Sequence, residues 1–158
     1  MSKEYLFRAE QTVNRPLAEV FDFFSRPENL AKITPPRLGF VILTPTPIQM
    51  KPGAVIEYHI RVFGVPLRWV TLITEYEPPY RFVDLQKKGP YRLWHHTHVF
   101  KALGPDRTLL TDEVRYALPL GILGELARLL FVRRDVESIF DYRRQVIARL
   151  FGPKPDEY

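Results

Sequence analysis

Hydrophobic and polar residues alternate in short segments over most of the chain between Phe40 and Tyr116, and these segments are rich in Val, Ile, Thr, Tyr, Phe and Trp. Alternation with this composition predicts β-strands that each have one buried face. A similar segment near the start, Glu4–Val13, predicts a first strand. The other six predicted strands are Phe40–Leu43, Ala54–Phe63, Leu67–Tyr76, Tyr80–Gln86, Tyr91–Leu103 and Arg107–Tyr116.

The turns between the later strands are short and contain glycine or proline, as at Gly64-Val65-Pro66 and Gly104-Pro105-Asp106. Turns of this length join strands that are neighbours in space and run in opposite directions. The strands from Ala54 onward therefore predict an antiparallel meander.

Two short helices are predicted between the first and second strands. Asn14 is the predicted N-cap of the first helix, with Pro16 in its first turn. Pro27 opens the second helix, and Pro35-Pro36 ends it. The apolar residues of the first helix recur at helical spacing, at Leu17, Val20, Phe21 and Phe24.

The segment from Leu120 to Phe151 contains no proline and predicts a helical tail, but its apolar stripe changes phase. One straight helix cannot bury both stripes on the same surface. We therefore predict a short helix near Ile122–Leu130, a kink or change of direction, and a long helix near Arg133–Phe151. The first stripe is Leu123, Leu126, Ala127 and Leu130, and the second is Val132, Val136, Ile139, Phe140, Val146, Ile147 and Leu150.

The long helix must bury its apolar face, and the predicted sheet is the large surface available to it. These elements predict an α+β fold in which a curved seven-stranded antiparallel sheet wraps around a long C-terminal helix. At 158 residues, the chain is expected to form a single domain over 1–158. A curved sheet closed by one helix leaves a cavity, which predicts a protein that holds an apolar guest.

Composition and charge narrow the function classes. The net charge is +5, but the basic residues are scattered and form no block of the kind that binds nucleic acid. No apolar run reaches the length of a membrane span, and the charged first residues do not resemble a signal peptide, so we expect a cytoplasmic protein. The chain has no cysteine, which excludes thiol chemistry. Two methionines and fifteen prolines suggest a thermophilic source.

Side-chain alternation places a set of polar residues on the concave face of the sheet. Taking Phe82, Phe100 and Val114 as inward residues sets the phase of three strands, although the opposite phase stays open from sequence alone. The predicted ligand-binding residues are Tyr58, Phe82, Asp84, Gln86, Trp94, His96, His98, Asp112 and Tyr116 on the sheet and Arg143 on the helical tail.

Arg143 lies in the centre of the second apolar stripe of the tail. A guanidinium there must pair with a carboxylate or meet a ligand anion, and Asp84 and Asp112 are the inward acids beneath it. His96 and His98 have three interpretations: members of a structural polar network, direct ligand contacts, or metal ligands. The metal interpretation is the least favoured because the next histidine, His59, lies on the outer face, so we expect no metal and no cofactor.

Several of these segments resemble the helix-grip fold of the START and birch-pollen-allergen superfamily, often called SRPBCC. The N-terminal segment Arg15–Phe24 and the turn Pro27–Leu30 carry the resemblance in the first part of the chain. The later segments are similar to a bacterial branch described as ligand-binding or cyclase/dehydrase-like. They are Phe82–Phe100, with Asp84, Gln86, Trp94, His96 and His98, then Thr111–Tyr116 and Ile139–Arg143.

The resemblance covers about Glu4 to Phe151 and is specific for the fold rather than for the function. The preferred interpretation is a protein that binds a hydrophobic small molecule, either lipid, polyketide or isoprenoid-like, as a monomer or homodimer. An aromatic cyclase/dehydratase that uses histidine and aspartate as acid and base is the first alternative. A protein-partner or co-chaperone module is the second, and an exposed apolar patch over Leu123–Leu130 would favour it.

Overall fold

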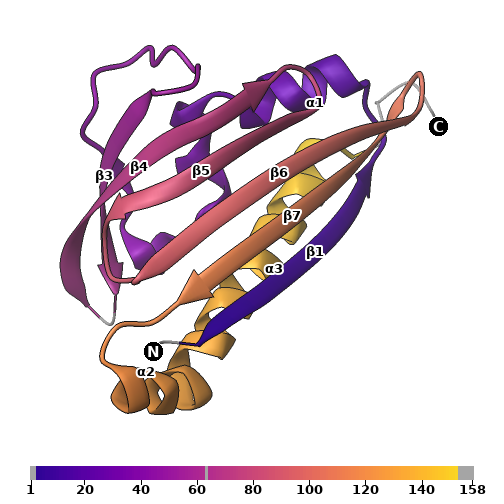
Figure 1. Cartoon of the computed structure of the whole chain (residues 1–158). Coiled ribbons are helices and arrows are strands. Elements are labelled where there is room, and N and C mark those ends of the chain that lie inside the picture. Colours follow the sequence, from indigo (N-terminus) through magenta and orange to yellow (C-terminus); the bar gives the residue numbers. More distant parts are fainter. Residues whose placement is uncertain (1–2, 63, 153–158) are drawn as a thin grey trace.

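The chain folds into one open sheet of seven strands, which a computed structural model describes for residues 3–62 and 64–152. The strands lie in the order β1-β7-β6-β5-β4-β3-β2, and every neighbouring pair is antiparallel (Figure 1). The first strand has the predicted bounds. The strands are β1 (Glu4–Val13), β2 (Val41–Ile42), β3 (Val55–Val62), β4 (Val65–Glu77), β5 (Arg81–Lys88), β6 (Leu93–Gly104) and β7 (Arg107–Ala117).

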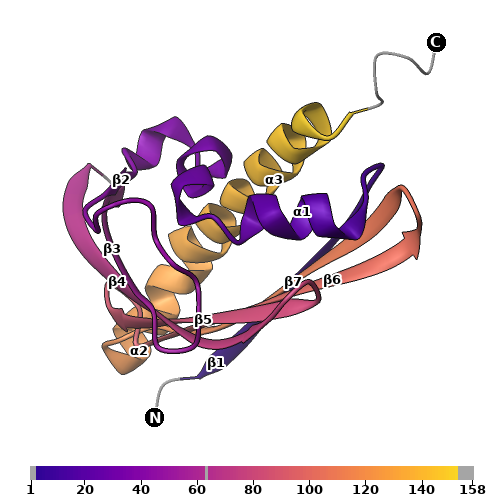
Figure 2. The ribbon, with the colours of Figure 1, turned by 90° about the horizontal axis from the view of Figure 1, so that it is seen from above.

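The helices cover one face of this sheet. Figure 2 shows the long helix and the first helix on the same, concave side of the curved strands. This arrangement confirms the predicted α+β helix-grip fold. The helical elements are α1 (Leu17–Phe24), the 3₁₀ helices η1 (Pro27–Ile33) and η2 (Pro36–Leu38), α2 (Gly121–Ala127), the π-helical turn η3 (Arg128–Val132) and α3 (Arg133–Leu150).

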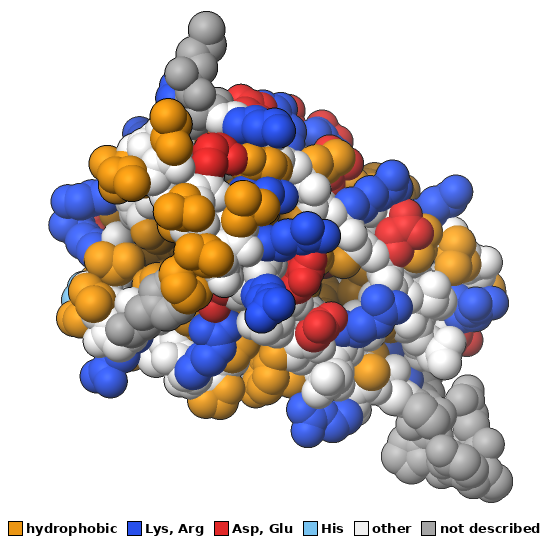
Figure 3. All heavy atoms as spheres, turned by 90° about the horizontal axis from the view of Figure 1, so that it is seen from below, with side chains coloured by type: hydrophobic (Ala, Val, Ile, Leu, Met, Phe, Trp, Pro, Cys, Tyr) orange, Lys and Arg blue, Asp and Glu red, His pale blue; other side chains and the backbone are white. Residues whose placement is uncertain are grey.

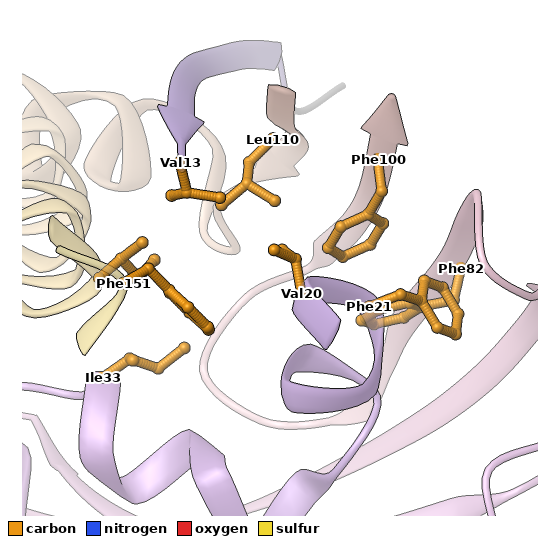
Figure 4. Close-up of a cluster of buried hydrophobic side chains, with 9 residues drawn as sticks. Val13, Val20, Phe21, Ile33, Phe82, Phe100, Leu110 and Phe151 are labelled. Carbon is orange, nitrogen blue, oxygen red and sulfur yellow. The ribbon is translucent and has the colours of Figure 1, made fainter. Parts of the chain in front are cut away.

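The main core lies where α1 and the end of α3 meet the sheet. Phe82 and Phe100 are buried there, and Val114 is buried in a neighbouring cluster, so the predicted phase of β5, β6 and β7 is confirmed. Phe21 of α1 packs edge-on against Phe100, with ring centres 5.2 Å apart. Figure 4 shows the side chains of this cluster, which are Val13, Val20, Phe21, Ile33, Phe82, Phe100, Leu110, Ile147 and Phe151.

Some residues predicted for the core are less buried than expected. Phe24, Ile139 and Val146 are half-buried, whereas Ile60 is buried as predicted. Ile139 and Phe24 border the cavity described below, which leaves part of each side chain accessible.

Helix α1 begins two residues later than the sequence predicted. Its N-cap is Pro16, whose carbonyl accepts a hydrogen bond from the Val20 amide at 3.1 Å, and no side chain caps the helix. An Asn14 cap would require Arg15 as the first helical residue. The residue before a proline is sterically disfavoured in the helical conformation, so the prediction of Asn14 as N-cap was wrong.

The β3–β4 hairpin also differs from the prediction. Val62 pairs with Val65, so Val65 and Pro66 belong to β4 rather than to the turn. Pro66 is tolerated because β5 pairs with β4 only from Val70 onward, and the missing amide of Pro66 therefore leaves no ladder bond unmade. The predicted end of the third strand at Phe63 lies outside the described residues. The predicted strand Phe40–Leu43 is reduced to the two residues of β2.

The helical tail is continuous from Gly121 to Leu150, and its phase break falls within η3. A π-helical turn holds one more residue than an α-helical turn, so it rotates the apolar stripe without interrupting the helix. Figure 1 shows the tail changing direction between α2 and α3, as predicted. The short predicted helix Ile122–Leu130 is therefore α2 together with part of η3.

Helix α3 buries one stripe against the sheet, formed by Val136, Phe140, Arg143 and Ile147. Phe140 packs on Phe7 of β1, with ring centres 4.7 Å apart. Polar residues on the other side of α3 face solvent. Over residues 3–62 and 64–152, no helix combines the length and apolar character that crossing a bilayer requires.

Candidate functional site

A cavity of about 320 Å³ lies between the concave face of the sheet and α3. It exists because the strands curve away from the helix, so side chains from the two layers do not meet everywhere. The inward residues of β3 line it in sequence alternation, as predicted for that strand. Its lining includes Leu30 and Ile33 of η1, Ile56, Tyr58, Ile60 and Val62 of β3, Trp69, Thr71 and Ile73 of β4, and Ile139 and Phe140 of α3.

One side of the cavity is an aromatic wall formed by Tyr58, Trp69, Tyr91 and Trp94. Tyr58 and Trp69 are cross-strand partners, and their rings stack with centres 5.9 Å apart and planes 13° apart. Trp94 meets Trp69 edge-on, with ring centres 5.6 Å apart. Burial raises the pKa of both tyrosines above the ordinary value, so the aromatic wall presents neutral phenols.

A second side of the cavity carries a polar cluster, in which Asp84, His96, His98 and Arg143 line the cavity and Asp112 joins them without lining it. His98 Nε2 donates a hydrogen bond to Asp84 Oδ2 at 2.5 Å, and His96 Nε2 donates to Asp112 Oδ1 at 2.8 Å. The two imidazole rings stack with centres 3.6 Å apart. Strands β5, β6 and β7 present these four side chains on one face because the residues alternate in register across the three strands.

Helix α3 adds Arg143 to the cluster from the opposite layer. Its Nη2 lies 3.3 Å from Asp112 Oδ1, and the residue is only 8% exposed. The prediction that Arg143 pairs with one of the two inward acids is therefore confirmed. The rings of Phe24 and Phe140 lie within 5.2 and 5.6 Å of the guanidinium, so aromatic faces surround the buried charge.

The environment shifts the pKa of three members of the cluster. Burial, helped by the neighbouring His96, lowers the pKa of His98 to about 4 despite the opposing carboxylates. Burial alone would raise the pKa of Asp112, but Arg143 and the histidines outweigh it and hold that pKa far below the usual range. The histidines likewise lower the pKa of Asp84 against the effect of burial. At neutral pH, His98 is therefore uncharged and both carboxyls are ionised.

Three buried polar atoms on cavity residues have no hydrogen-bond partner among the described residues. They are Trp69 Nε1, His98 Nδ1 and Arg143 Nε. The first and third are donors, and the imidazole nitrogen is an acceptor when His98 is neutral. Buried polar groups are normally satisfied, so these atoms mark the positions where a polar group of a guest would gain most.

The ligand atoms of Asp84, His96 and His98 lie within 4.8 Å of one another, a spacing that a metal ion could use. The two histidine rings are stacked, however, with planes only 25° apart. Their nitrogen lone pairs lie in the ring planes and do not converge on one point. Each Nε2 is also engaged by a carboxylate. The arrangement is that of a hydrogen-bonded network.

Seven of the ten predicted site residues line the cavity: Tyr58, Phe82, Asp84, Trp94, His96, His98 and Arg143. The prediction that they bind a ligand stays a prediction. The other three predicted residues do not line it. The Gln86 side chain instead forms hydrogen bonds with the backbone amide and carbonyl of Tyr91. Asp112 lies behind His96 and borders a separate hollow beside β1. Tyr116 is buried against Tyr5, Tyr91 and Trp94.

Trp69 and Thr71 were not predicted as cavity residues. The predicted turn at Gly64-Val65-Pro66 would place Trp69 opposite Arg61, on the outer face, because a register that is shifted by an odd number of residues, here three, reverses every side chain. The observed pairing of Val62 with Val65 places Trp69 opposite Tyr58. A predicted strand that began at Val65 instead of Leu67 would have placed both Trp69 and Thr71 on the cavity face.

The sequence matches a family model described as "Polyketide cyclase / dehydrase and lipid transport" over residues 13–139. The matched segment runs from the end of β1 into α3, so it contains all the strands that line the cavity. Among curated proteins, none matches the sequence.

Solved structures with the same fold have low sequence identity to this chain. An aromatase/cyclase from Streptomyces sp. R1128 has 17% identity and a TM-score of 0.67, over 95% of this chain and 98% of that one. A START superfamily protein from Mycobacterium smegmatis has 15% identity and a TM-score of 0.68, over 92% and 98%. A norcoclaurine synthase point mutant from Thalictrum flavum has 10% identity and a TM-score of 0.66, over 95% and 98%.

Proposed function

Because the chain belongs to the polyketide cyclase/dehydrase and lipid transport family, we propose that it binds a hydrophobic small molecule between the sheet and α3. The observation that carries the proposal is a cavity of about 320 Å³ whose lining is mostly apolar and aromatic, with the polar cluster on one side and a few other polar residues such as Asn29 and Thr71. Sites for small apolar ligands have this character, with a few polar groups that fix orientation. A lipid, a polyketide or an isoprenoid-like molecule has the matching chemistry.

The ligand is expected to carry oxygen atoms at its polar end. Arg143 Nε, in the polar cluster, is a buried donor that needs an acceptor, and a carbonyl, hydroxyl or carboxylate oxygen supplies one. Trp69 Nε1, in the aromatic wall, is a second buried donor without a partner among the described residues. Arg143 already pairs with Asp112, so the cluster tolerates a neutral oxygen as well as an anionic one. The aromatic wall would then contact the apolar part of the ligand.

Native mass spectrometry of the purified protein tests whether a small molecule copurifies with it. Fluorescent fatty-acid and sterol probes test binding directly, and we expect a dissociation constant on the order of 1 µM for the better probe. Ile60→Trp places a larger side chain in the cavity and should abolish probe binding. Val99→Trp is the matched control, because Val99 lies on the same sheet but faces outward.

Loss of binding in the Ile60 variant alone supports the proposal, provided that circular dichroism shows both variants folded. Equal binding by the two variants would place the probe elsewhere. If neither fatty acid nor sterol binds and no molecule copurifies, the binding function is rejected.

An aromatic cyclase/dehydratase-type enzyme is the second candidate, and the contacts of His98 with Asp84 favour it. Asp84 would orient the ring, and the unpaired Nδ1 would accept a proton from a carbon next to a carbonyl group. Arg143 Nε would then donate a hydrogen bond to the enolate oxygen. The lowered pKa of His98, about 4, weighs against this role, because a general base works best with a pKa near the working pH.

Deuterium exchange into a 1,3-diketone probe in heavy water separates the two candidates. An enzyme should accelerate exchange at the carbon between the carbonyls, and His98→Gln should remove the acceleration. A carrier should bind the probe without changing its exchange rate.

A further inference from the structure

Helix α2 presents its apolar side to solvent. Six large apolar side chains between residues 120 and 130 are 53% to 87% exposed, and together they are called the α2 patch. At about 100° per residue, the three from 122 to 126 fall within an arc of roughly 100°, and Leu129 and Leu130 are exposed on the η3 turn that follows. The α2 patch consists of Leu120, Ile122, Leu123, Leu126, Leu129 and Leu130.

The polar side of α2 and η3 faces the protein instead. Glu125 accepts a hydrogen bond from the Tyr5 hydroxyl, and the Arg128 guanidinium lies over the Tyr5 ring, 3.4 Å from its centre. Gly124 is buried so closely that a Cβ there would lie 2.2 Å from the Pro119 carbonyl oxygen. A surface helix normally buries its apolar stripe. These contacts hold α2 in the reverse orientation, which leaves the apolar stripe facing outward.

Positive charge accompanies the α2 patch. Between residues 120 and 134 the charged side chains are three arginines and one glutamate; Glu125 and Arg128 both contact Tyr5, which leaves Arg133 and Arg134 beside the patch. Arg133 and Arg134 lie three and four residues after the patch and are exposed, and Arg133 forms an ion pair of 3.3 Å with Glu137. Figure 3 views the molecule from the α2 side and shows hydrophobic side chains grouped together, with Lys and Arg side chains at their edges. An apolar stripe with basic neighbours suits the surface of an anionic bilayer.

The α2 patch is also continuous with the walls of the cavity. Leu118, two residues before the patch, lines the cavity, and so do Val132 at the end of η3 and Asp135 in the first turn of α3. A surface that holds α2 would therefore lie beside the cavity between the sheet and α3.

We propose that the α2 patch docks the protein on an anionic lipid bilayer. A symmetric dimer through the same patch is disfavoured, because a two-fold interface is formed by the same surface of both copies and would bring two sets of Arg133 and Arg134 into one interface. A bilayer instead offers acyl chains to the leucines and anionic headgroups to the arginines. The docking does not depend on the identity of the ligand in the cavity.

Flotation with vesicles tests the proposal on the full chain. Wild-type protein should float with vesicles of phosphatidylcholine mixed with phosphatidylglycerol, and less with phosphatidylcholine alone. The double variant Ile122→Asn with Leu126→Asn should lose flotation, because it removes two apolar side chains of the α2 patch. Both side chains are exposed, so the fold should tolerate the change. Leu103→Asn, an exposed leucine at the opposite end of the sheet, is the matched control and should float as wild type (Figure 1). Arg134→Gln should weaken binding to the anionic vesicles by about fivefold.

Three outcomes overturn the proposal. In the first, the protein floats with neither vesicle, and in the second the double variant floats as well as wild type. In the third, light scattering shows a wild-type dimer that the double variant does not form, and vesicles bind neither protein. Binding of a fluorescent fatty acid in solution is measured on the same variants. Retained probe binding with lost flotation separates docking from ligand binding. Flotation without probe binding and without a copurified molecule would reject the proposed function and leave the docking surface standing.

Discussion

Each histidine of the polar cluster bonds the carboxylate diagonal to it rather than the one directly opposite. His96 is the cross-strand partner of Asp84 but bonds Asp112, whereas His98 is the partner of Asp112 but bonds Asp84. Diagonal neighbours in a sheet are within reach of long side chains. The crossing links β5, β6 and β7 through side chains in addition to the backbone ladder, so the charge on these groups affects the stability of the sheet.

Acidification should remove stability through His98 before the carboxylates become protonated. Burial lowers the pKa of His98 to about 4, whereas a histidine in the unfolded chain has a pKa of about 6.5. Between these pH values the unfolded chain binds a proton that the folded protein does not, so stability falls as the pH drops through this window. Urea denaturation at a series of pH values should show a loss of about 3 kcal/mol between pH 7 and 4.

His98→Gln should flatten the pH profile in that window. His59→Gln is the matched control, since His59 is exposed on the outer face of β3. Asp84 and Asp112 have lowered pKa values, so their contribution is present above about pH 4 and is lost below it. An unchanged slope in the His98 variant would show that another group causes the acid sensitivity.

Arg143→Met should destabilise the protein by about 3 kcal/mol, because it leaves the largely buried Asp112 carboxylate without its guanidinium partner. The double variant Arg143→Met with Asp112→Asn should recover part of that loss, since the uncompensated charge is then absent. Urea denaturation at neutral pH of the four proteins in the cycle gives the coupling energy. Strict additivity would show that the ion pair contributes nothing to stability.

At the scale of single residues, helical periodicity was sufficient to predict that Arg143 is buried beside a carboxylate. An arginine inside an apolar stripe must either pair with an acid or meet a ligand anion. Strand alternation likewise placed His96, His98 and Asp84 on the cavity face. It did not separate residues that line the cavity from those buried behind them, such as Asp112 and Tyr116. That difference depends on the local curvature of the sheet, which alternation does not encode.

Among the elements, the helical tail combines two helices with different roles. Helix α3 buries Val136, Phe140, Arg143 and Ile147, whereas α2 buries only Gly124. The π-helical turn η3 between them lets each helix face its own direction. The phase change of the apolar stripe was visible in the sequence. A break between two helices, a kink or an extra residue in one helical turn would each explain that change. The sequence therefore predicted that the tail reorients without predicting how.

Deleting Leu129 should convert the π-helical turn into an α-helical turn and rotate α2 by about 100° relative to α3. The contacts of Tyr5 with Glu125 and Arg128 should be lost, but the loss of stability should be small because α2 buries so little. Deleting Glu137 instead should rotate the later part of α3 off the sheet and destabilise the protein severely. Thermal denaturation compares the two deletions, and similar melting temperatures would contradict this account.

Phe100→Ala should destabilise the protein by about 3–5 kcal/mol, as expected for removing a buried aromatic ring. Phe100 joins α1 to the sheet through Phe21 and Phe24, with ring centres 5.2 and 5.7 Å away. Val99→Ala, on the outer face of the same strand, is the control and should change stability little. A loss below about 1 kcal/mol in urea denaturation of the Phe100 variant would mean that the core relaxes around the missing ring.

On the scale of the whole molecule, the helices α1 and α3 that pack on the sheet lie on its concave face. The outer face carries surface ion pairs, such as Arg68 with Glu57 and Arg81 with Glu75. The sequence predicted this architecture because hairpin turns dictate a meander and one long helix must cover it. The register shifts between β4 and β5, which bend the strands, were not predictable from the alternation of side chains.

The pairing of β1 with β7 has a consequence for how the protein forms on the ribosome. The paired residues are separated by 95 to 113 positions along the chain, from Val13 with Thr108 to Glu4 with Ala117. Every other ladder joins strands that follow one another directly. The first strand to be synthesised must therefore wait, unpaired, until the last strand has emerged. The local hairpins can form in the meantime, and closure of this long loop is expected to be the slow step of folding.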